Sequence, residues 1–236
     1  IFFYERTGRT DTFGNLTKAD DPVSKPPTAE GDVRDFCPTP LPGNALLFVS
    51  DRAGGCGGTD IYASHYNPGQ DAWSAPRNLG CAPNGPNTPG FELSPSLVET
   101  AAGTLLYFPT GEGIGLGQDL YESRMRIDGS FGVGMPVMEL NTPGPLNDRQ
   151  PNVGRNGLEI VFASNRDGDG IGDIWTSTRS SVFEAWSPPV NLSATVPFST
   201  EGAGESRPSL SWDGKRLYYG SGGVYVSTRK PGGGSK

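Results

Sequence analysis

The chain has little histidine: His65 is the only one among 236 residues. A Ser-His-Asp triad would have to use this residue, and its neighbours carry no signature of one. A zinc site built on several histidines is excluded. A nucleophilic cysteine would also lack a nearby base. Neither a phosphate-binding Gly-x-x-x-x-Gly-Lys motif nor a dinucleotide fingerprint is present. Several enzyme classes are therefore disfavoured.

Long hydrophobic runs and basic clusters are missing as well. The longest apolar runs, such as residues 45–49, are far too short to cross a bilayer as a helix. The formal net charge is −7, so nucleic acid and an anionic membrane surface are not expected partners. No window of about eleven residues carries a helical apolar stripe without an interrupting glycine or proline. We therefore expect neither a membrane span nor a long helix.

Glycine and proline are abundant, with 35 and 22 residues respectively, and they separate short apolar segments at a regular spacing. Four anchor prolines mark the repeat at positions 38, 95, 151 and 208, with 57, 56 and 57 residues between them. Each unit contains an apolar strand, a glycine-rich loop, a strand that opens with Asp and an aromatic residue, and a further short strand. Four short strands per unit are typical of one propeller blade.

Several of these segments match a known repeat. The fourth unit begins Pro-Ser-Leu-Ser-Trp-Asp-Gly at 208–214, and the first and third units contain Ser-x-Arg at 50–52 and 164–166. Asp-Ile-Tyr follows at 60–62. These residues resemble the PD40 or TolB-like propeller repeat over about residues 35–229. The second unit departs from it, with Pro-Thr-Gly at 109–111. The resemblance implies an all-β propeller scaffold, and such scaffolds serve many functions.

The residues at the two ends of the chain decide the blade number. The 37 residues before Pro38 and the 28 after Pro208 amount to slightly more than one repeat. We therefore favour four antiparallel blades in one domain at 1–230, closed by a strand at 1–6 that docks on the C-terminal sheet and covers its edge. Residues 231–236 are expected to be a flexible tail. Five blades are the alternative, because 1–6 align with a third strand that 224–229 already supply.

An acidic residue stands three positions before each anchor proline. In a propeller the first strand of each blade lines the central channel, so these carboxylates are expected around one mouth of it. Arginines recur close by in the sequence. Either the acids and arginines clamp neighbouring blades, or they form a polar funnel that binds a ligand. The candidate ligand-binding residues are Asp35, Glu92, Asp148, Glu205, Arg52, Arg149, Arg166 and Arg207.

A second candidate site is the Asp- and Gly-rich loop of the third unit. Asp167, Asp169 and Asp173 place several oxygen ligands on one short loop, as calcium requires. The loop resembles the calcium repeats of thrombospondin type 3, and less closely an EF-hand, whose terminal Glu is missing. Calcium is the one candidate cofactor, and an ordinary glycine-rich turn is the other interpretation of this loop.

Three cysteines are present, so at least one cannot pair within the chain. Cys56 and Cys81 lie in loops that should emerge on the same face, which favours a disulfide between them. Cys37 lies on that face too and competes as a partner, and three reduced thiols are the other alternative. A disulfide would indicate a secreted, periplasmic or extracellular protein.

Two functions remain open at this stage. The first is a monomeric, non-catalytic module that binds a protein or glycan partner through its loop face and central funnel. The second is a carboxylate-based hydrolase or lyase that uses the acid–arginine funnel, with or without calcium. An open, water-filled mouth with unpaired acids would favour the enzyme, and a mouth plugged by acid–arginine pairs would favour binding at its rim.

Overall fold

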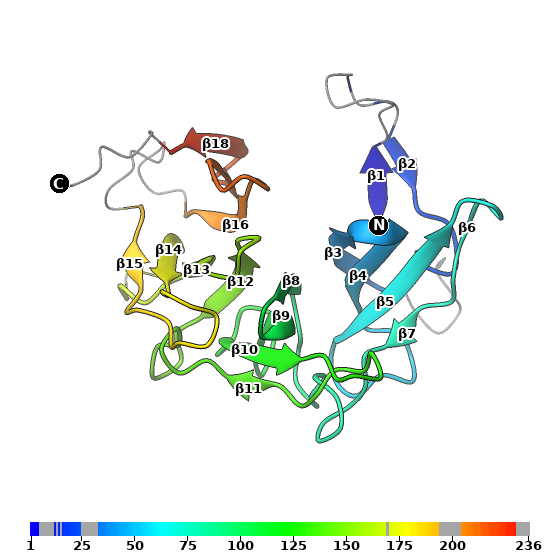
Figure 1. Ribbon diagram of the computed structural model, residues 1–236, viewed down its shortest axis with the longest axis horizontal. Coiled ribbons are helices and arrows are strands. Elements are labelled where there is room, and N and C mark those ends of the chain that lie inside the picture. Colours follow the sequence, from blue (N-terminus) through cyan, green and yellow to red (C-terminus); the bar gives the residue numbers. More distant parts are fainter. Residues whose placement is uncertain are drawn as a thin grey trace.

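The computed structural model describes residues 1–4, 12, 14, 16–24, 33–168, 170–193 and 204–229. Within these residues the regular structure is β, apart from one turn of 3-10 helix, η1 at Pro42–Asn44. The strands form four antiparallel sheets in a ring, the arrangement of a four-bladed propeller, and one two-stranded ribbon (Figure 1). The predicted all-β propeller is confirmed with four blades rather than five. None of the described segments forms a helix that could span a membrane.

Each sheet follows the chain from its innermost strand outward. Blades 1 and 2 contain β3 (Asp35–Leu41), β4 (Ala45–Ser50), β5 (Asp60–Asn67), β6 (Ala72–Trp73) and β7 (Arg77–Asn78), then β8 (Ser96–Thr100), β9 (Gly103–Thr110), β10 (Asp119–Arg124) and β11 (Met135–Pro136). Blades 3 and 4 contain β12 (Asp148–Val153), β13 (Glu159–Ser164), β14 (Asp173–Thr178) and β15 (Val190–Asn191), then β16 (Ser206–Leu210), β17 (Arg216–Gly220) and β18 (Val224–Thr228).

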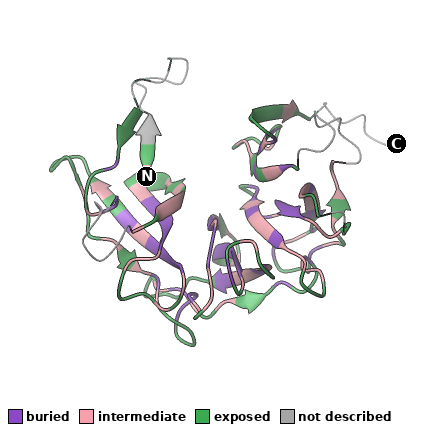
Figure 2. Ribbon diagram, turned by 180° about the vertical axis from the view of Figure 1, so that it is seen from behind, coloured by how far each residue is buried: buried purple, intermediate pink, exposed green. Residues whose placement is uncertain are grey.

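The core lies between the blades. Blades 2 and 3 have a neighbouring blade on each side, so both faces of their sheets are buried. Along β9 the side chains alternate between the two neighbours. Leu105 and Tyr107 pack towards blade 3, in a cluster that includes Trp186, whereas Leu106 and Phe108 pack towards blade 1. Figure 2 shows the buried residues concentrated along the strands of the blades. The apolar runs of the sequence are therefore sheet centres packed on two sides.

The innermost strands share an unusual backbone feature. The residue before each anchor proline has a positive φ: 50° at Cys37, 37° at Ser94, 56° at Gln150 and 52° at Arg207. The ladder register shifts there in β3, β12 and β16. Proline has no N–H to donate to the ladder, so a bulge at this point avoids an unmade hydrogen bond. The repeat thus places one strained residue at the same level in every blade.

The N-terminal segment packs on blade 1. Strand β1 (Phe2–Tyr4) pairs with β2 (Leu16–Lys18), and the Ile1 amino group donates to Ser24 Oγ at 2.7 Å. We expected this strand to dock on the C-terminal sheet, but its partner is β2. The described part of the fourth sheet has three strands, and Figure 1 shows β18 and β1 on opposite sides of the opening of the ring. Residues 5–6 and the tail 231–236 lie outside the described residues.

A disulfide joins Cys56 in the β4–β5 loop to Cys81 after β7, with the two Cα atoms 5.4 Å apart. This confirms the predicted pairing over its two alternatives. Cys37 is the free cysteine and is half-buried on the innermost strand of blade 1. The disulfide therefore ties the loop face of blade 1, and the free thiol faces the ring centre.

Candidate functional site

The centre of the ring holds a cavity of about 500 Å³. The innermost segments of all four blades line it, and each contributes its anchor proline, Pro38, Pro95, Pro151 and Pro208. A smaller compartment of about 220 Å³ shares five lining residues with this cavity: Phe36, Cys37, Ser94, Gln150 and Arg207. It extends to the β9–β10 loop at Ile114 and Gly115. We call the two compartments together the funnel.

The four strained residues form the shared wall of both compartments. They carry four different groups at equivalent backbone positions: the thiol of Cys37, the hydroxyl of Ser94, the amide of Gln150 and the guanidinium of Arg207. Cys37 Sγ and Ser94 Oγ lie 3.4 Å apart, and Gln150 Oε1 accepts a hydrogen bond from the Arg207 N–H at 2.8 Å. Strained backbone often marks functional positions, so this wall is the candidate site.

Replacing Arg207 by glycine should raise the free energy of unfolding by about 1 kcal/mol, because glycine tolerates its φ of 52° without strain. The Arg207 side chain is exposed, so the variant loses no buried contact. The hydrogen bond to Gln150 comes from the backbone N–H, so the variant keeps it. Arg149→Gly is the matched control, because Arg149 has no positive φ and glycine weakens a strand. Urea unfolding of the two variants measures the difference. If Arg207→Gly is less stable than the wild type, the backbone at Arg207 is not strained.

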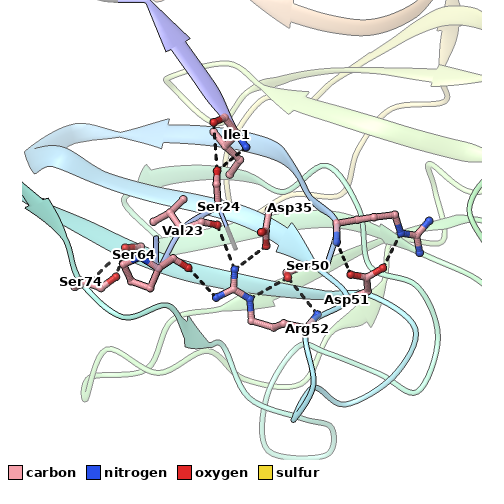
Figure 3. Close-up of polar contacts among 11 residues, drawn as sticks. Ile1, Val23, Ser24, Asp35, Ser50, Asp51, Arg52, Ser64 and Ser74 are labelled. Atoms are coloured by element: carbon pink, nitrogen blue, oxygen red, sulfur yellow. Dashed lines mark hydrogen bonds and ion pairs between the residues drawn. The ribbon is translucent and has the colours of Figure 1, made fainter. Parts of the chain in front are cut away.

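The predicted acids of blades 1 and 3 are held by ion pairs. Arg52 Nη2 lies 2.6 Å from Asp35 Oδ1, and Arg166 Nη2 lies 2.5 Å from Asp148 Oδ1. Figure 3 shows Arg52 pointing towards Asp35 and the Val23 carbonyl. Both pairs lie within one blade, not between neighbouring blades as the clamp interpretation predicted. The reason is that each arginine lies two residues after the end of the second strand, beside the first strand of its own sheet.

The Ser-x-Arg motif explains how these arginines are held. Ser50 Oγ accepts a hydrogen bond from Arg52 Nε at 2.9 Å, and Ser164 Oγ accepts one from Arg166 Nε at 3.0 Å. Each guanidinium also stacks on aromatic rings of its blade; Arg52 lies 5.1 Å from the ring centre of Phe48. The motif is thus a structural support for the buried acid.

Blades 2 and 4 lack this motif and have a glutamate in place of the aspartate. Glu92 Oε1 accepts hydrogen bonds from Thr88 at 2.5 Å and Thr110 at 2.7 Å, and burial raises its pKa to about 7. Burial also raises the pKa of Glu205, which Ser193 hydrogen-bonds. The longer side chain reaches hydroxyl partners where no arginine is present. None of the four predicted acids lines either compartment of the funnel.

The predicted arginines divide into two groups. Arg52 and Arg166 are used in the ion pairs described above, whereas Arg149 and Arg207 line the funnel. The fully buried Gln118 also lines it, and sequence reasoning missed this residue. The sequence did contain a signal for the shared wall. The residue directly before each anchor proline recurs at the constant spacing of the repeat, and its type differs in every unit. Gln118 gave no comparable signal.

In the Asp-rich loop, Asn191 Nδ2 donates hydrogen bonds to Asp167 Oδ2 at 2.9 Å and to Asp173 Oδ2 at 2.8 Å. Asp169 lies outside the described residues. Among those that are described, no three ligand-type side chains converge as a metal site. Calcium at this loop stays a prediction, and thermal unfolding with EDTA or with calcium chloride tests it, because an ion bound only by the folded state raises Tm.

No family model matches the chain, and no curated protein matches it. Among solved structures, it is similar to an α-L-arabinofuranosidase from Lactobacillus brevis (14% identity, TM-score 0.54, covering 85% of this chain and 64% of that one). It is also similar to Zg3597, a family 117 glycoside hydrolase from Zobellia galactanivorans (12%, 0.52, 97% and 74%). A third similar structure is a putative TolB from Agrobacterium tumefaciens (18%, 0.49, 78% and 56%).

At these identities the likeness shows the fold alone. The chain spans less than two thirds of the TolB and arabinofuranosidase chains. The four sheets and their likeness to the arabinofuranosidase and to Zg3597 support a β-propeller. The function has to be argued from the funnel itself.

Proposed function

We propose that the protein is a binding module that takes a protein or carbohydrate partner at its loop face and seats part of that partner in the funnel. The observation that carries this proposal is the chemistry of the funnel wall. It presents arginine, amide, hydroxyl, thiol and apolar side chains. The four neighbouring acids do not face it and are engaged in hydrogen bonds and ion pairs. Concave, mostly apolar walls with a few polar groups are typical of ligand sites.

The same observation argues against the carboxylate-based hydrolase or lyase. Such an enzyme needs two carboxyl groups that face one substrate space. Asp35 and Asp148 are each bound by an arginine, and Glu92 is fully buried between two threonines. A pair of acids available to a substrate is therefore not found among the residues that line the funnel.

The disulfide supports a location outside the cytoplasm. Cysteine pairs persist in oxidising compartments and are rare where thiols are kept reduced. We therefore propose that the protein is secreted, periplasmic or extracellular. Mass spectrometry of protein from its native source, with and without reduction, tests whether Cys56 and Cys81 are paired there.

Cys37 makes the binding proposal testable, because its thiol lines both compartments. Glycan and peptide arrays first identify a ligand of the unmodified protein. Alkylation of Cys37 with N-ethylmaleimide should then lower the affinity for that ligand at least tenfold, since the added group fills the shared wall. Affinity is measured by biolayer interferometry before and after alkylation.

Cys37→Ser treated with the same reagent is the control and should keep its affinity. Trp212→Ala tests a different surface, since Trp212 is exposed and lies in the β16–β17 turn outside the funnel. Binding that survives alkylation of Cys37 but is lost in Trp212→Ala would place the partner elsewhere and refute the proposed site.

A further inference from the structure

The 220 Å³ compartment contains two arginines and no acid. Arg149 and Arg207 both line it, and every other lining residue is neutral. Neither guanidinium has a hydrogen-bond or ion-pair partner in the described part of the chain. Arg52 and Arg166, by contrast, are each held by a carboxylate. Two uncompensated positive charges in a concave space attract an anion and raise its local concentration.

The Arg149 guanidinium lies between two blades. A Cβ built on Gly115, in the β9–β10 loop, would be 3.5 Å from Arg149 Nη1, and one built on Gly172, in the β13–β14 loop, would be 3.5 Å from Nη2. Both loops therefore lie within van der Waals reach of the planar group, one on each side. A guanidinium binds a carboxylate or a phosphate through two parallel hydrogen bonds, so either anion fits this position.

Gln118 is a second, independent sign of a ligand in this compartment. Its side chain is fully buried and lines the cavity, yet neither Nε2 nor Oε1 has a hydrogen-bond partner among the described residues. Its backbone is fixed, because the N–H donates to Asn147 Oδ1 at 3.2 Å and the carbonyl accepts from the Asp148 N–H at 2.7 Å. Buried amides are nearly always satisfied, so a ligand with adjacent donors and acceptors would complete this one.

The size and walls of the compartment restrict that ligand. Phe36, Leu93 and Pro109 supply apolar surface, and about 220 Å³ is smaller than the usual pocket for a whole ligand. The compartment therefore holds one end of a longer molecule that continues into the 500 Å³ cavity. A peptide commonly binds by adding a strand. Here the innermost strands are already paired on their outer side, and the anchor prolines have no N–H to donate. The wall therefore offers few backbone groups to which a peptide could add as a strand.

We propose that this compartment binds the terminal residue of an acidic oligosaccharide, with a uronate carboxylate on Arg149 and Arg207 and sugar hydroxyl groups on Gln118. Vicinal hydroxyls donate and accept side by side, as the free carboxamide requires. This inference rests on the proposed binding function and names its ligand class.

NMR titrations of the intact protein with D-glucuronate, D-glucose and N-acetylglycine test the proposal. Glucuronate should bind at least tenfold more tightly than glucose, and its affinity should fall as sodium chloride is added. Arg149→Ala and Arg207→Ala should each weaken glucuronate binding at least tenfold and leave glucose unchanged. Gln118→Leu should weaken both sugars. Arg216→Ala, which removes an exposed arginine outside the funnel, should match the wild type.

Equal affinity for glucuronate and glucose, or full affinity in Arg149→Ala, would overturn the proposal. If N-acetylglycine binds with the same arginine dependence and glucuronate does not, the compartment takes a peptide carboxylate, and the sugar assignment is also wrong. These failures leave the proposed function intact as long as alkylation of Cys37 still blocks the partner. If alkylation of Cys37 has no effect on binding, both the proposed function and the assignment of the compartment to a sugar are wrong.

Discussion

Asp148→Ala should lower the free energy of unfolding by about 3–5 kcal/mol, the range seen when one partner of a buried ion pair is removed. The Asp148 side chain is fully buried and that of Arg166 is 13% exposed. Without the carboxylate, the guanidinium keeps its stacking on Phe162 and Trp175 but is left as an uncompensated charge. The backbone N–H of Thr142 also loses its acceptor, Asp148 Oδ2, at 2.6 Å.

The chain offers a matched control for this measurement. Asp51 pairs with Arg34 on the surface, at 2.6 Å, where the arginine side chain is 56% exposed. Asp51→Ala should cost less than about 1 kcal/mol, because water screens an exposed pair. Urea unfolding followed by tryptophan fluorescence gives both values. Similar losses in the two variants would mean that the Asp148 pair is not buried in solution.

A double variant separates the charge from the packing. Asp148→Leu combined with Arg166→Met removes both charges and fills similar volume, so it should recover much of the stability lost in Asp148→Ala. If the double variant is as unstable as the single one, the loss comes from the backbone contacts of Asp148 and not from the stranded guanidinium.

The repeat of the sequence was sufficient to predict the architecture. Anchor prolines at a constant spacing, each followed by an apolar run, indicate one blade per unit, and the structure has four. This succeeded because the blades are local in sequence: each sheet pairs neighbouring segments of one unit. The closure of the ring involves segments far apart in sequence, on which the repeat carries no information, and in the described residues β1 pairs with β2.

The direction of the four acids could not be predicted, because the bulge changes which residues face the funnel. In a regular strand, Asp148 and Gln150 would share a face, two residues apart. The bulge instead lets consecutive residues, Arg149 and Gln150, line the funnel, while Asp148 turns into the blade. The sequence pattern identified the correct segment of each blade but the wrong side chains within it.

The arginines show the same limit. Arg52 and Arg166 follow a serine at the end of a second strand, and that context places them on the buried acids. Arg149 and Arg207 stand beside the anchor prolines, and that context turns them to the funnel. Both contexts can be read in the sequence, but the direction that each gives to its arginine depends on the register of the bulge and on tertiary packing, which a single sequence does not contain.

Glu92 should make the stability of the protein depend on pH, since burial raises its pKa from 4.5 to about 7. A pKa that is higher in the folded state means that the stabilising contribution is fully present below pH 4.5. It is lost as the pH rises through about 7. The loss amounts to about 3 kcal/mol by pH 8. Glu92→Gln cannot ionise, so its stability should exceed that of the wild type at pH 8, and the difference should close towards pH 4.

The position of Glu92 determines where this loss acts. Its backbone carbonyl accepts a hydrogen bond from Thr59 Oγ1 at 2.8 Å, and its N–H donates to the Thr59 carbonyl at 3.0 Å, so it joins blade 2 to blade 1. Ionisation should therefore loosen this junction first, which hydrogen exchange of the Glu92 amide measures, since that N–H donates across the junction. Glu99→Gln, which removes an exposed carboxyl of the same blade, is the matched control. A constant difference between Glu92→Gln and the wild type from pH 4 to 8 would mean that Glu92 keeps an ordinary pKa, and hence that water reaches its carboxyl group.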